Sequence, residues 1–200
     1  IYVTLHNNPS ENGYYNVNLV KHDKDGSNVS GVKFAVDRTV NGGSNVEVYT
    51  EQNPLITSSE KAVNIGGTIN IKGTEVGTDD VFILKELDVD DGYSFTKIPQ
   101  KIKLTIKKAT RTNSDDSKTH YVSGVELRLI DDNGQEIQPT ETGNKSVVET
   151  TVNGEKANIT AELIDNTITL TVVNPDKTGL YSLDLTKVEK GTNTSLDGAE

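Results

Sequence analysis

The chain has 200 residues, a formal net charge of −10, and no cysteine, methionine or tryptophan. The lack of cysteine excludes disulfides, cysteine nucleophiles and thiolate zinc sites. The acidic balance argues against nucleic acid as a partner, because phosphate binding needs clustered Lys and Arg. No apolar run approaches the roughly 18 residues of a membrane span, so none is expected within this sequence.

Short segments of alternating apolar and polar residues follow one another along the chain and indicate β-strands. They lie at 15–21, 32–36, 45–49, 68–72, 81–86, 101–107, 125–130, 146–152, 157–163 and 167–173. Turn-forming stretches such as KDGS, NGGS, DDNG and VNGE separate them. Because strands do not alternate with helices, the pattern predicts an all-β protein built as a β-sandwich.

Two distant stretches of the chain are similar to each other. Residues 9–21 (PSENGYYNVNLVK) and 175–187 (PDKTGLYSLDLTK) share Pro, Gly, Tyr, Leu and Lys at matching positions. Just upstream of them, IYVTLHN at 1–7 is similar to ITLTVVN at 168–174. Collinear matches of this kind predict a tandem repeat. The expected units are the last strand of a preceding repeat at 1–8, a complete repeat at 9–175, and the opening strand of a following repeat at 176–200.

Three of the expected strands carry a polar residue in the phase of their apolar face. Lys21 follows Val17 and Leu19, Glu86 follows Phe82 and Leu84, and Asn174 follows Ile168, Leu170 and Val172. Side chains alternate strictly along a strand, so all three polar side chains are expected to point inward. Any one of these residues, taken alone, is explained by its position at the end of a strand, where an inward-pointing side chain can still reach water. Together, however, a lysine, a glutamate and an asparagine form a chemically meaningful set.

The chemistry of this set follows from burial. A buried lysine favours its neutral amine, which is a nucleophile, and a buried glutamate favours its protonated form. The protonated carboxyl of Glu86 can polarise the side-chain carbonyl of Asn174 and pass a proton to the leaving group. The Lys21 amine then attacks, ammonia leaves, and an isopeptide bond remains. This is single-turnover chemistry that depends on proximity, and it differs from enzymatic turnover.

The motifs around these residues resemble those of one known family. The segment VNLVKHDKDGSNVSGVKFAV is similar to the opening of a Cna B-type (SpaA-like, prealbumin-like) domain, and VFILKELDVDDGY is similar to its glutamate motif, with Gly92-Tyr93 as the closing pair. TLTVVNP resembles its closing strand, and LDLTKVEKGTNTSLDGAE resembles the opening of another such domain. The sequence departs from the family where Val89-Asp90-Asp91 replaces the usual Ala-Pro-x.

The resemblance implies an immunoglobulin-like β-sandwich of the reverse, prealbumin-like type. It also implies an intramolecular isopeptide bond between Lys21 and Asn174, promoted by Glu86. Asn7 (or Asn8) and Lys187 would bond to residues of the neighbouring repeats. Such domains form stalks of adhesins and shafts of pili on the cell wall of Gram-positive bacteria, outside the cell. The expected function is therefore a structural stalk or shaft repeat, with adjacent repeats as partners and no cofactor.

The repeat is long for this family, and the extra length lies between about 99 and 165. This region is expected to add strands to the sandwich or to form an inserted subdomain. An alternative function is a ligand-binding adhesin module that contacts a host protein or glycan through 99–165.

No metal site is expected. The Asp-rich turns at 22–26 and 88–92 lack an acidic residue at the twelfth position of an EF-hand loop, so hairpin turns account for them better. The three histidines are scattered along the chain and show no spacing typical of metal ligands.

Overall fold

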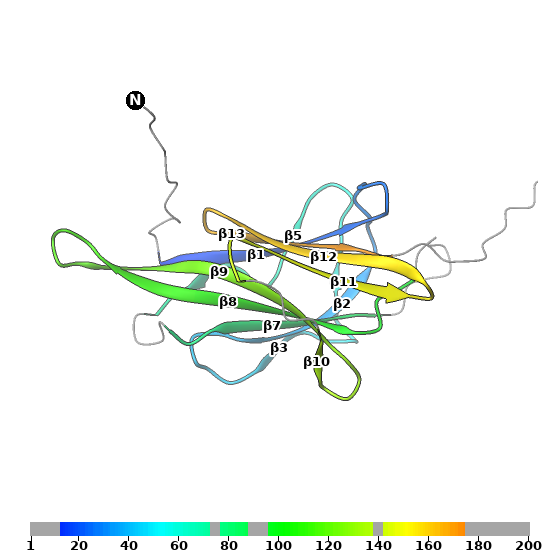
Figure 1. Ribbon diagram of the computed structural model, residues 1–200, viewed down its shortest axis with the longest axis horizontal. Helices are drawn as coiled ribbons and strands as arrows, with labels where there is room; N and C mark the ends of the chain where they lie inside the picture. The colour runs from blue at the N-terminus through cyan, green and yellow to red at the C-terminus, as the bar shows by residue number, and fades with distance from the viewer. Residues whose placement is uncertain (1–12, 73–76, 88–95, 138–141, 175–200) are drawn as a thin grey trace, which may run out of the picture.

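The structure is a computed structural model that describes residues 13–72, 77–87, 96–137 and 142–174. The elements of secondary structure in these ranges are all β-strands, and they form two sheets (Figure 1). The prediction of an all-β sandwich with extra strands in its second half is therefore confirmed. The described residues contain no helix that is long and apolar enough to cross a membrane.

The first sheet has six strands in the order β11-β12-β13-β1-β5, and β6 also pairs with β1. Its members are β1 (Tyr14–His22), β5 (Val63–Asn64), β6 (Ile69–Asn70), β11 (Lys145–Val152), β12 (Glu155–Ile164) and β13 (Thr167–Val173). β1 and β13 pair in parallel, with Lys21 opposite Val172, whereas the other pairs are antiparallel. The first and last strands of the sandwich are thus direct neighbours that run in the same direction.

The second sheet has seven strands in the order β10-β9-β8-β7-β2-β3, and β4 also pairs with β2. Its members are β2 (Lys33–Thr39), β3 (Val46–Tyr49), β4 (Leu55–Ile56), β7 (Asp80–Glu86), β8 (Lys101–Thr112), β9 (Lys118–Ile130) and β10 (Glu136–Ile137). All of its pairs are antiparallel. Antiparallel strands can be joined by short turns, which agrees with the many turn signals in the sequence.

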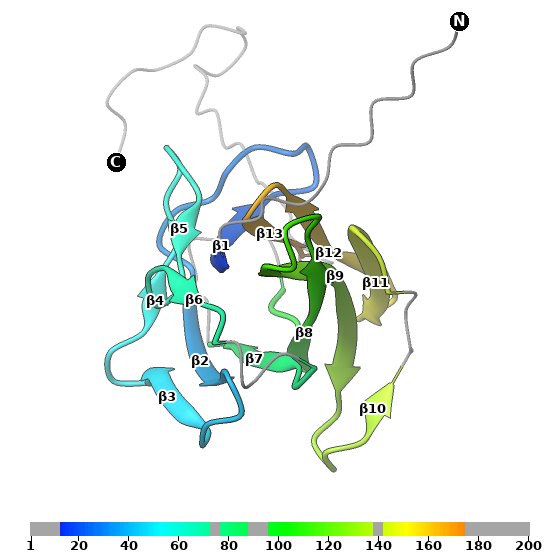
Figure 2. The ribbon, with the colours of Figure 1, turned by 90° about the vertical axis from the view of Figure 1, so that its left-hand side faces the viewer.

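The hydrophobic core lies between the two sheets, which surround it in the view along the strands (Figure 2). Burial alternates along β1 and along β7, as expected for strands that turn one face to the core. Phe34 and Phe82 are among the largest fully buried side chains. Each buried side chain of this size stabilises the fold by roughly 1.5–3 kcal/mol relative to an exposed position.

The turn between β11 and β12 shows how the local sequence sets the strand register. Asn153 and Gly154 both have positive φ, at 53° and 85°. Asn-Gly tolerates this conformation, and the resulting turn twists in the sense that two antiparallel strands require. The two strands pair without interruption from Val152 and Glu155 to Lys145 and Glu162.

The region between about 99 and 165 belongs to the sandwich itself. β8, β9 and β10 extend the seven-stranded sheet, and β11 and β12 extend the six-stranded sheet. The β8–β9 hairpin projects beyond the other strands at one end of the molecule (Figure 1). Of the two possibilities raised by the sequence, extra strands are therefore observed and an inserted subdomain is not.

Candidate functional site

Lys21 lies near the end of β1, on the face of that strand that packs against the core. Tyr15, Val17, Leu19 and Lys21 are all fully buried, and the residues between them are partly exposed. The strand phase that buries the apolar residues therefore also buries the lysine. Its Nζ donates a hydrogen bond to the backbone oxygen of His22 at 2.8 Å.

Glu86 and Asn174 reach the same part of the core from two different strands. Glu86 is the last residue of β7 in the seven-stranded sheet, and it is 2% exposed. Asn174 directly follows β13, the parallel neighbour of β1, and it is 1% exposed. The predicted inward orientation of Lys21, Glu86 and Asn174 is confirmed. These three residues are called the Lys21 cluster below.

Hydrogen bonds join the carboxylate of Glu86 to the asparagine and to the backbone. Asn174 Nδ2 lies 2.8 Å from both Glu86 Oε1 and Glu86 Oε2 and donates to them. The Ile98 amide donates to Oε2 at 3.0 Å. Asn174 Oδ1 is buried and accepts no hydrogen bond from the residues described. The carboxyl thus contacts the amide nitrogen of Asn174, whereas the contact expected from the sequence was with the carbonyl oxygen.

Burial controls the electrostatics of the Lys21 cluster. Loss of solvent lowers the pKa of Lys21 to about 8, and the attraction of nearby Glu86 and Asp23 only partly opposes this effect. Burial also raises the pKa of Glu86, against the opposing influences of Lys21 and of the hydrogen bonds from Ile98 and Asn174. Both shifts favour the uncharged forms, an amine and a carboxylic acid, because a low-dielectric site penalises charge.

The remaining expected site residues lie outside the part of the chain that the structure describes. They are Asn7 and Lys187, the proposed links to neighbouring repeats, and the Gly92-Tyr93 pair of the glutamate motif. The expected repeat boundaries at 1–8 and 176–200 also lie outside it, so the tandem repeat remains a prediction.

A second polar cluster, which the sequence did not predict, lies at the opposite ends of β1 and β7, with three buried members and a partly exposed Asn41. It consists of Tyr15, Asn41, Asp80 and Lys108 and is called the Lys108 cluster below. Tyr15 Oη donates to Asp80 Oδ2 at 2.6 Å, and Lys108 Nζ lies 2.8 Å from Asp80 Oδ1. Burial, with Asp80 as a second cause, raises the pKa of Tyr15, so this residue stays a phenol and donates.

The sequence contained a signal for three members of this cluster. Asp80 and Tyr15 share the inward phase of their strands with Glu86 and Lys21. Lys108 continues the series Ile102, Leu104 and Ile106, but the expected strand ended at residue 107, one position too early. Asn41 lies in the turn between β2 and β3, where no alternation predicts its orientation.

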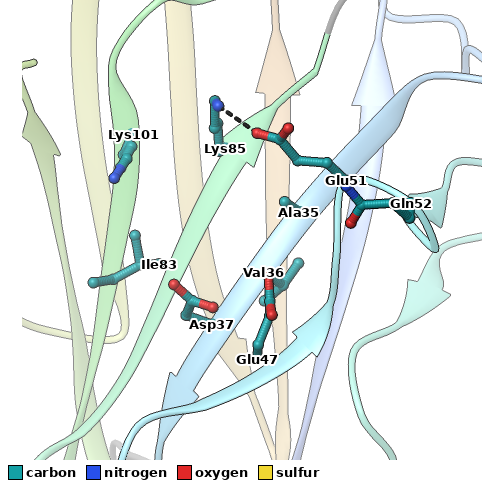
Figure 3. Close-up of a pocket in the computed structure, with 9 residues that line it drawn as sticks. All are labelled: Ala35, Val36, Asp37, Glu47, Glu51, Gln52, Ile83, Lys85 and Lys101. Carbon is teal, nitrogen blue, oxygen red and sulfur yellow. Dashed lines mark hydrogen bonds and ion pairs between the residues drawn. The ribbon is translucent and has the colours of Figure 1, made fainter.

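A shallow depression of about 340 Å³ lies on the outer face of the seven-stranded sheet (Figure 3). It is lined by Ala35, Val36, Asp37, Glu47, Glu51, Gln52, Ile83, Lys85 and Lys101. Lys85 and Glu51 form an ion pair at its edge, at 2.6 Å, with both side chains about half exposed. Glu86 points to the other side of this sheet, so the depression is separate from the Lys21 cluster.

The Asp-rich turn after β1 is organised by its own hydrogen bonds. Asp23 Oδ1 accepts from the backbone amides of Asp25 and Ser27, at 3.0 and 2.8 Å. The backbone amide of Asp23 in turn donates to the oxygen of Ser27. This is the hairpin turn favoured by the sequence analysis. Among the described residues, no group of three or more His, Asp or Glu side chains is arranged to hold a metal ion.

Comparison with known proteins gives a likeness of fold. No family model and no curated protein matches the sequence. Among solved structures, a C-terminal fragment of the pilus adhesin SpaC from Lactobacillus rhamnosus GG is 15% identical, with a TM-score of 0.44 over 87% of this chain and 48% of that chain. SpaC in an open conformation is 13% identical, with a TM-score of 0.44 over 86% of this chain and 16% of that chain. This chain therefore spans less than half of the fragment, and the likeness concerns the all-β architecture alone.

Proposed function

We propose that this chain is a structural repeat of a bacterial surface adhesin or pilus-like fibre, and that an isopeptide bond joins Lys21 to Asn174. The observation that carries this proposal is the Lys21 cluster. Strands from both sheets bring a lysine, a carboxylic acid and an asparagine into one buried site, where burial favours the uncharged form of each ionisable group. The proposed location is the cell-wall surface of a Gram-positive bacterium, with adjacent repeats as partners.

The proposed reaction requires only the three side chains. The neutral Lys21 amine attacks Cγ of Asn174, a new Nζ–Cγ bond forms, and the Cγ–Nδ2 bond breaks. One proton moves from Nζ to Nδ2, so that ammonia leaves and the reaction is balanced. Glu86 lies 2.8 Å from the departing Nδ2, where its protonated carboxyl can deliver a proton and take one from the attacking amine.

A half-turn of the amide group of Asn174 gives Glu86 a second role. The two ends of an amide have nearly the same size, so the same space accepts either of them. After this rotation the protonated carboxyl donates to Oδ1, which at present accepts no hydrogen bond from the described residues. Polarisation of this carbonyl favours attack at Cγ, as hydrogen-bond donors do in oxyanion holes.

The position of the proposed bond explains what it does for the fold. Lys21 and Asn174 lie near the ends of two parallel, adjacent strands, the first and the last of the sandwich. When tension is applied at the start of β1 and beyond Asn174, it passes along β1, through the bond and out of the domain. The strands between them are then shielded from the applied force.

The bond also limits the unfolded state. Closing a loop of about 150 residues removes conformational entropy worth on the order of 5 kcal/mol. A cysteine-free chain obtains in this way a covalent constraint that other extracellular proteins obtain from disulfides.

The test is an intact mass of the folded chain, followed by a tryptic map. The expected product joins peptide 1–24, in which Lys21 resists cleavage, to peptide 157–177, with the loss of one ammonia. Glu86→Gln should abolish this product. Lys85→Arg, which changes the neighbouring exposed residue of β7, serves as the matched control and should leave it intact.

Recovery of peptides 157–177 and 1–21 as separate, unmodified species from the folded chain would contradict the bond. The three side chains would then be ordinary buried polar groups at strand ends. The ligand-binding adhesin module would become the function to pursue.

A further inference from the structure

The Lys108 cluster contains the same three types of functional group as the Lys21 cluster. Lys108 lies on β8, Asp80 is the first residue of β7, and Asn41 lies in the turn that follows β2. Lys108 Nζ is 2.8 Å from Asp80 Oδ1 and 3.2 Å from Asn41 Oδ1. An amine, a carboxyl and a side-chain amide therefore meet within hydrogen-bond distance at a second place in the molecule.

Lys108 and Asp80 form a fully buried pair. Both side chains are 0% exposed, and Lys108 Nζ lies 2.8 Å from Asp80 Oδ1. A proton can therefore pass directly from the lysine to the carboxyl during the reaction, which leaves a neutral amine, the nucleophilic form of lysine.

The hydrogen bonds around Asp80 hold it in a position to carry protons. Tyr15 donates to Oδ2, and the backbone amide of Asn41 donates to Oδ1 at 2.6 Å. These two contacts, from the other sheet and from the β2–β3 turn, hold the carboxyl between Lys108 and Asn41. Oδ1 then faces both the attacking amine and the residue that it would attack.

The amide of Asn41 is polarised by its neighbours. Its Oδ1 accepts from Lys108 Nζ and from the backbone amide of Lys72 at 3.3 Å, and its Nδ2 donates to the backbone oxygen of Asn70 at 2.8 Å. The Lys72 amide, as a donor at this carbonyl oxygen, would stabilise the negative charge that develops there during attack at the carbon, whereas Lys108 supplies the attacking nitrogen. The backbone of Asn41 has φ of 51°, a left-handed conformation that asparagine adopts more readily than most residues.

From this geometry we propose that Lys108 and Asn41 are joined by a second isopeptide bond, with Asp80 as the proton carrier. Lys108 Nζ bonds to Cγ of Asn41, the Cγ–Nδ2 bond breaks, and one proton passes from Nζ through Asp80 to the departing nitrogen. The products are the amide bond and one ammonia. This inference does not rest on the Lys21–Asn174 bond, because the two clusters share no residue.

The second bond would act inside one sheet. β8 and β2 are separated by β7 in the seven-stranded sheet. A covalent link from β8 to the β2–β3 turn would cross over the start of β7 and fix three strands to one another. It would also anchor the base of the β8–β9 hairpin, which projects at this end of the molecule (Figure 1).

A tryptic map of the folded, full-length chain tests the proposal directly. Trypsin cleaves after Arg38, Lys61, Lys107 and Arg111. The expected product is peptide 39–61 joined to peptide 108–111, lighter by one ammonia than the two separate peptides. Recovery of 39–61 unmodified, with cleavage after Lys108, would overturn the proposal even if every variant failed to fold.

Intact mass alone does not suffice, because Asn41 precedes Gly42 and such pairs can cyclise to a succinimide with the loss of ammonia. A succinimide leaves Lys108 open to trypsin and leaves 39–61 unlinked. That result would overturn the proposal as well.

Variants separate the two bonds. Lys108→Arg should remove the 39–61/108–111 product and reduce the total deficit by one ammonia, while the Lys21–Asn174 product persists. Glu86→Gln should remove the Lys21–Asn174 product, while the 39–61/108–111 product persists. Lys107→Arg is the matched control, because Lys107 is the neighbouring residue, is partly exposed and pairs with Asp79 at 2.5 Å, and this change should leave both products intact.

Discussion

The Lys21 and Lys108 clusters occupy opposite ends of the same two strands, β1 and β7. They differ in where along the chain the asparagine of each cluster lies. β1 carries Tyr15 at one end and Lys21 at the other, and β7 carries Asp80 and Glu86 in the same way. Phe82 and Leu84 fill the core between the two carboxyls. One sandwich thus holds two similar sets of groups, separated by buried apolar side chains.

The asparagines account for the difference between the two ends. Asn174 follows the last strand, so a bond to it encloses nearly the whole domain. Asn41 lies in an internal turn, so a bond to it encloses only part of the seven-stranded sheet. The comparison teaches that position in the chain, more than local chemistry, decides whether such a bond transmits tension or braces one sheet.

Mechanical pulling should show the largest difference. Asn174→Ala removes the proposed covalent path, so the enclosed strands should unfold under force and the unfolding free energy should fall by on the order of 5 kcal/mol. The unaltered chain should show no lengthening from residues 22–173. Single-molecule stretching from both ends and chemical denaturation measure the two quantities. Equal lengthening of the unaltered chain and of the Asn174→Ala variant would contradict a covalent path through Lys21 and Asn174.

Asn41→Gly should reduce stability without changing the response to pulling. The loop between 41 and 108 has about 67 residues, so loss of its closure costs about 4 kcal/mol. Glycine accepts the positive φ of this position, so the backbone itself is not strained. Asn153→Gly changes another turn asparagine with φ of 53° and serves as the control in chemical denaturation. An equally small loss of unfolding free energy in Asn41→Gly and Asn153→Gly would indicate that no bond forms at Asn41.

The pH dependence of stability should depend on whether Lys21 has reacted. In Asn174→Ala the amine remains free, with a pKa of about 8 in the folded chain against 10.5 without burial. Between these values the unfolded chain binds more protons, so stability should rise with increasing pH. This gain in unfolding free energy is absent below pH 8, where Lys21 is protonated and the folded state must accommodate its buried charge.

The control for this measurement is the double variant Lys21→Met/Asn174→Ala, which lacks the amine. Denaturation profiles from pH 7 to about 11 should show the additional rise only in the single variant. The cross-linked chain should also lack it, because an amide nitrogen does not titrate in this range. A rise of the same size in the cross-linked chain would contradict the assignment to Lys21.

Tyr15→Phe should have the smallest effect and should be confined to one end. It removes the hydrogen bond to Asp80 Oδ2 and leaves the ring in the core, at a cost of about 1–2 kcal/mol. Chemical denaturation measures the loss, and peptide mapping should show the Lys21–Asn174 product unchanged. Loss of that product would mean that the two clusters are coupled through the core.

The sequence predicted the fold and the Lys21 cluster for one physical reason, the strict alternation of side chains along a strand. The same rule extends to Tyr15, Asp80 and Lys108, and it missed Asp80 and Lys108 because one expected strand began at 81 and the other ended at 107. This rule could not predict Asn41, because Asn41 lies in a turn and only long-range packing brings it close to β8.

The elements that were missed have equally local reasons. β4, β5 and β10 have two residues each, too few for a period to be visible. Residues 108–124 contain polar residues in both phases, and those of the outer part of the β8–β9 hairpin are partly buried or exposed. Without a second layer to pack against, that part of the hairpin needs no apolar face.

The parallel pairing of β1 with β13 has a consequence for the length of a fibre. The chain joins the sandwich at one end of β1 and leaves it at the other, so each unit of the proposed fibre would contribute roughly the span of β1. Nine residues of strand at about 3.3 Å each give a contour of about 30 Å. A fibre of cross-linked units of this kind would be short for its mass and almost inextensible, behaving as a tether and not as a spring.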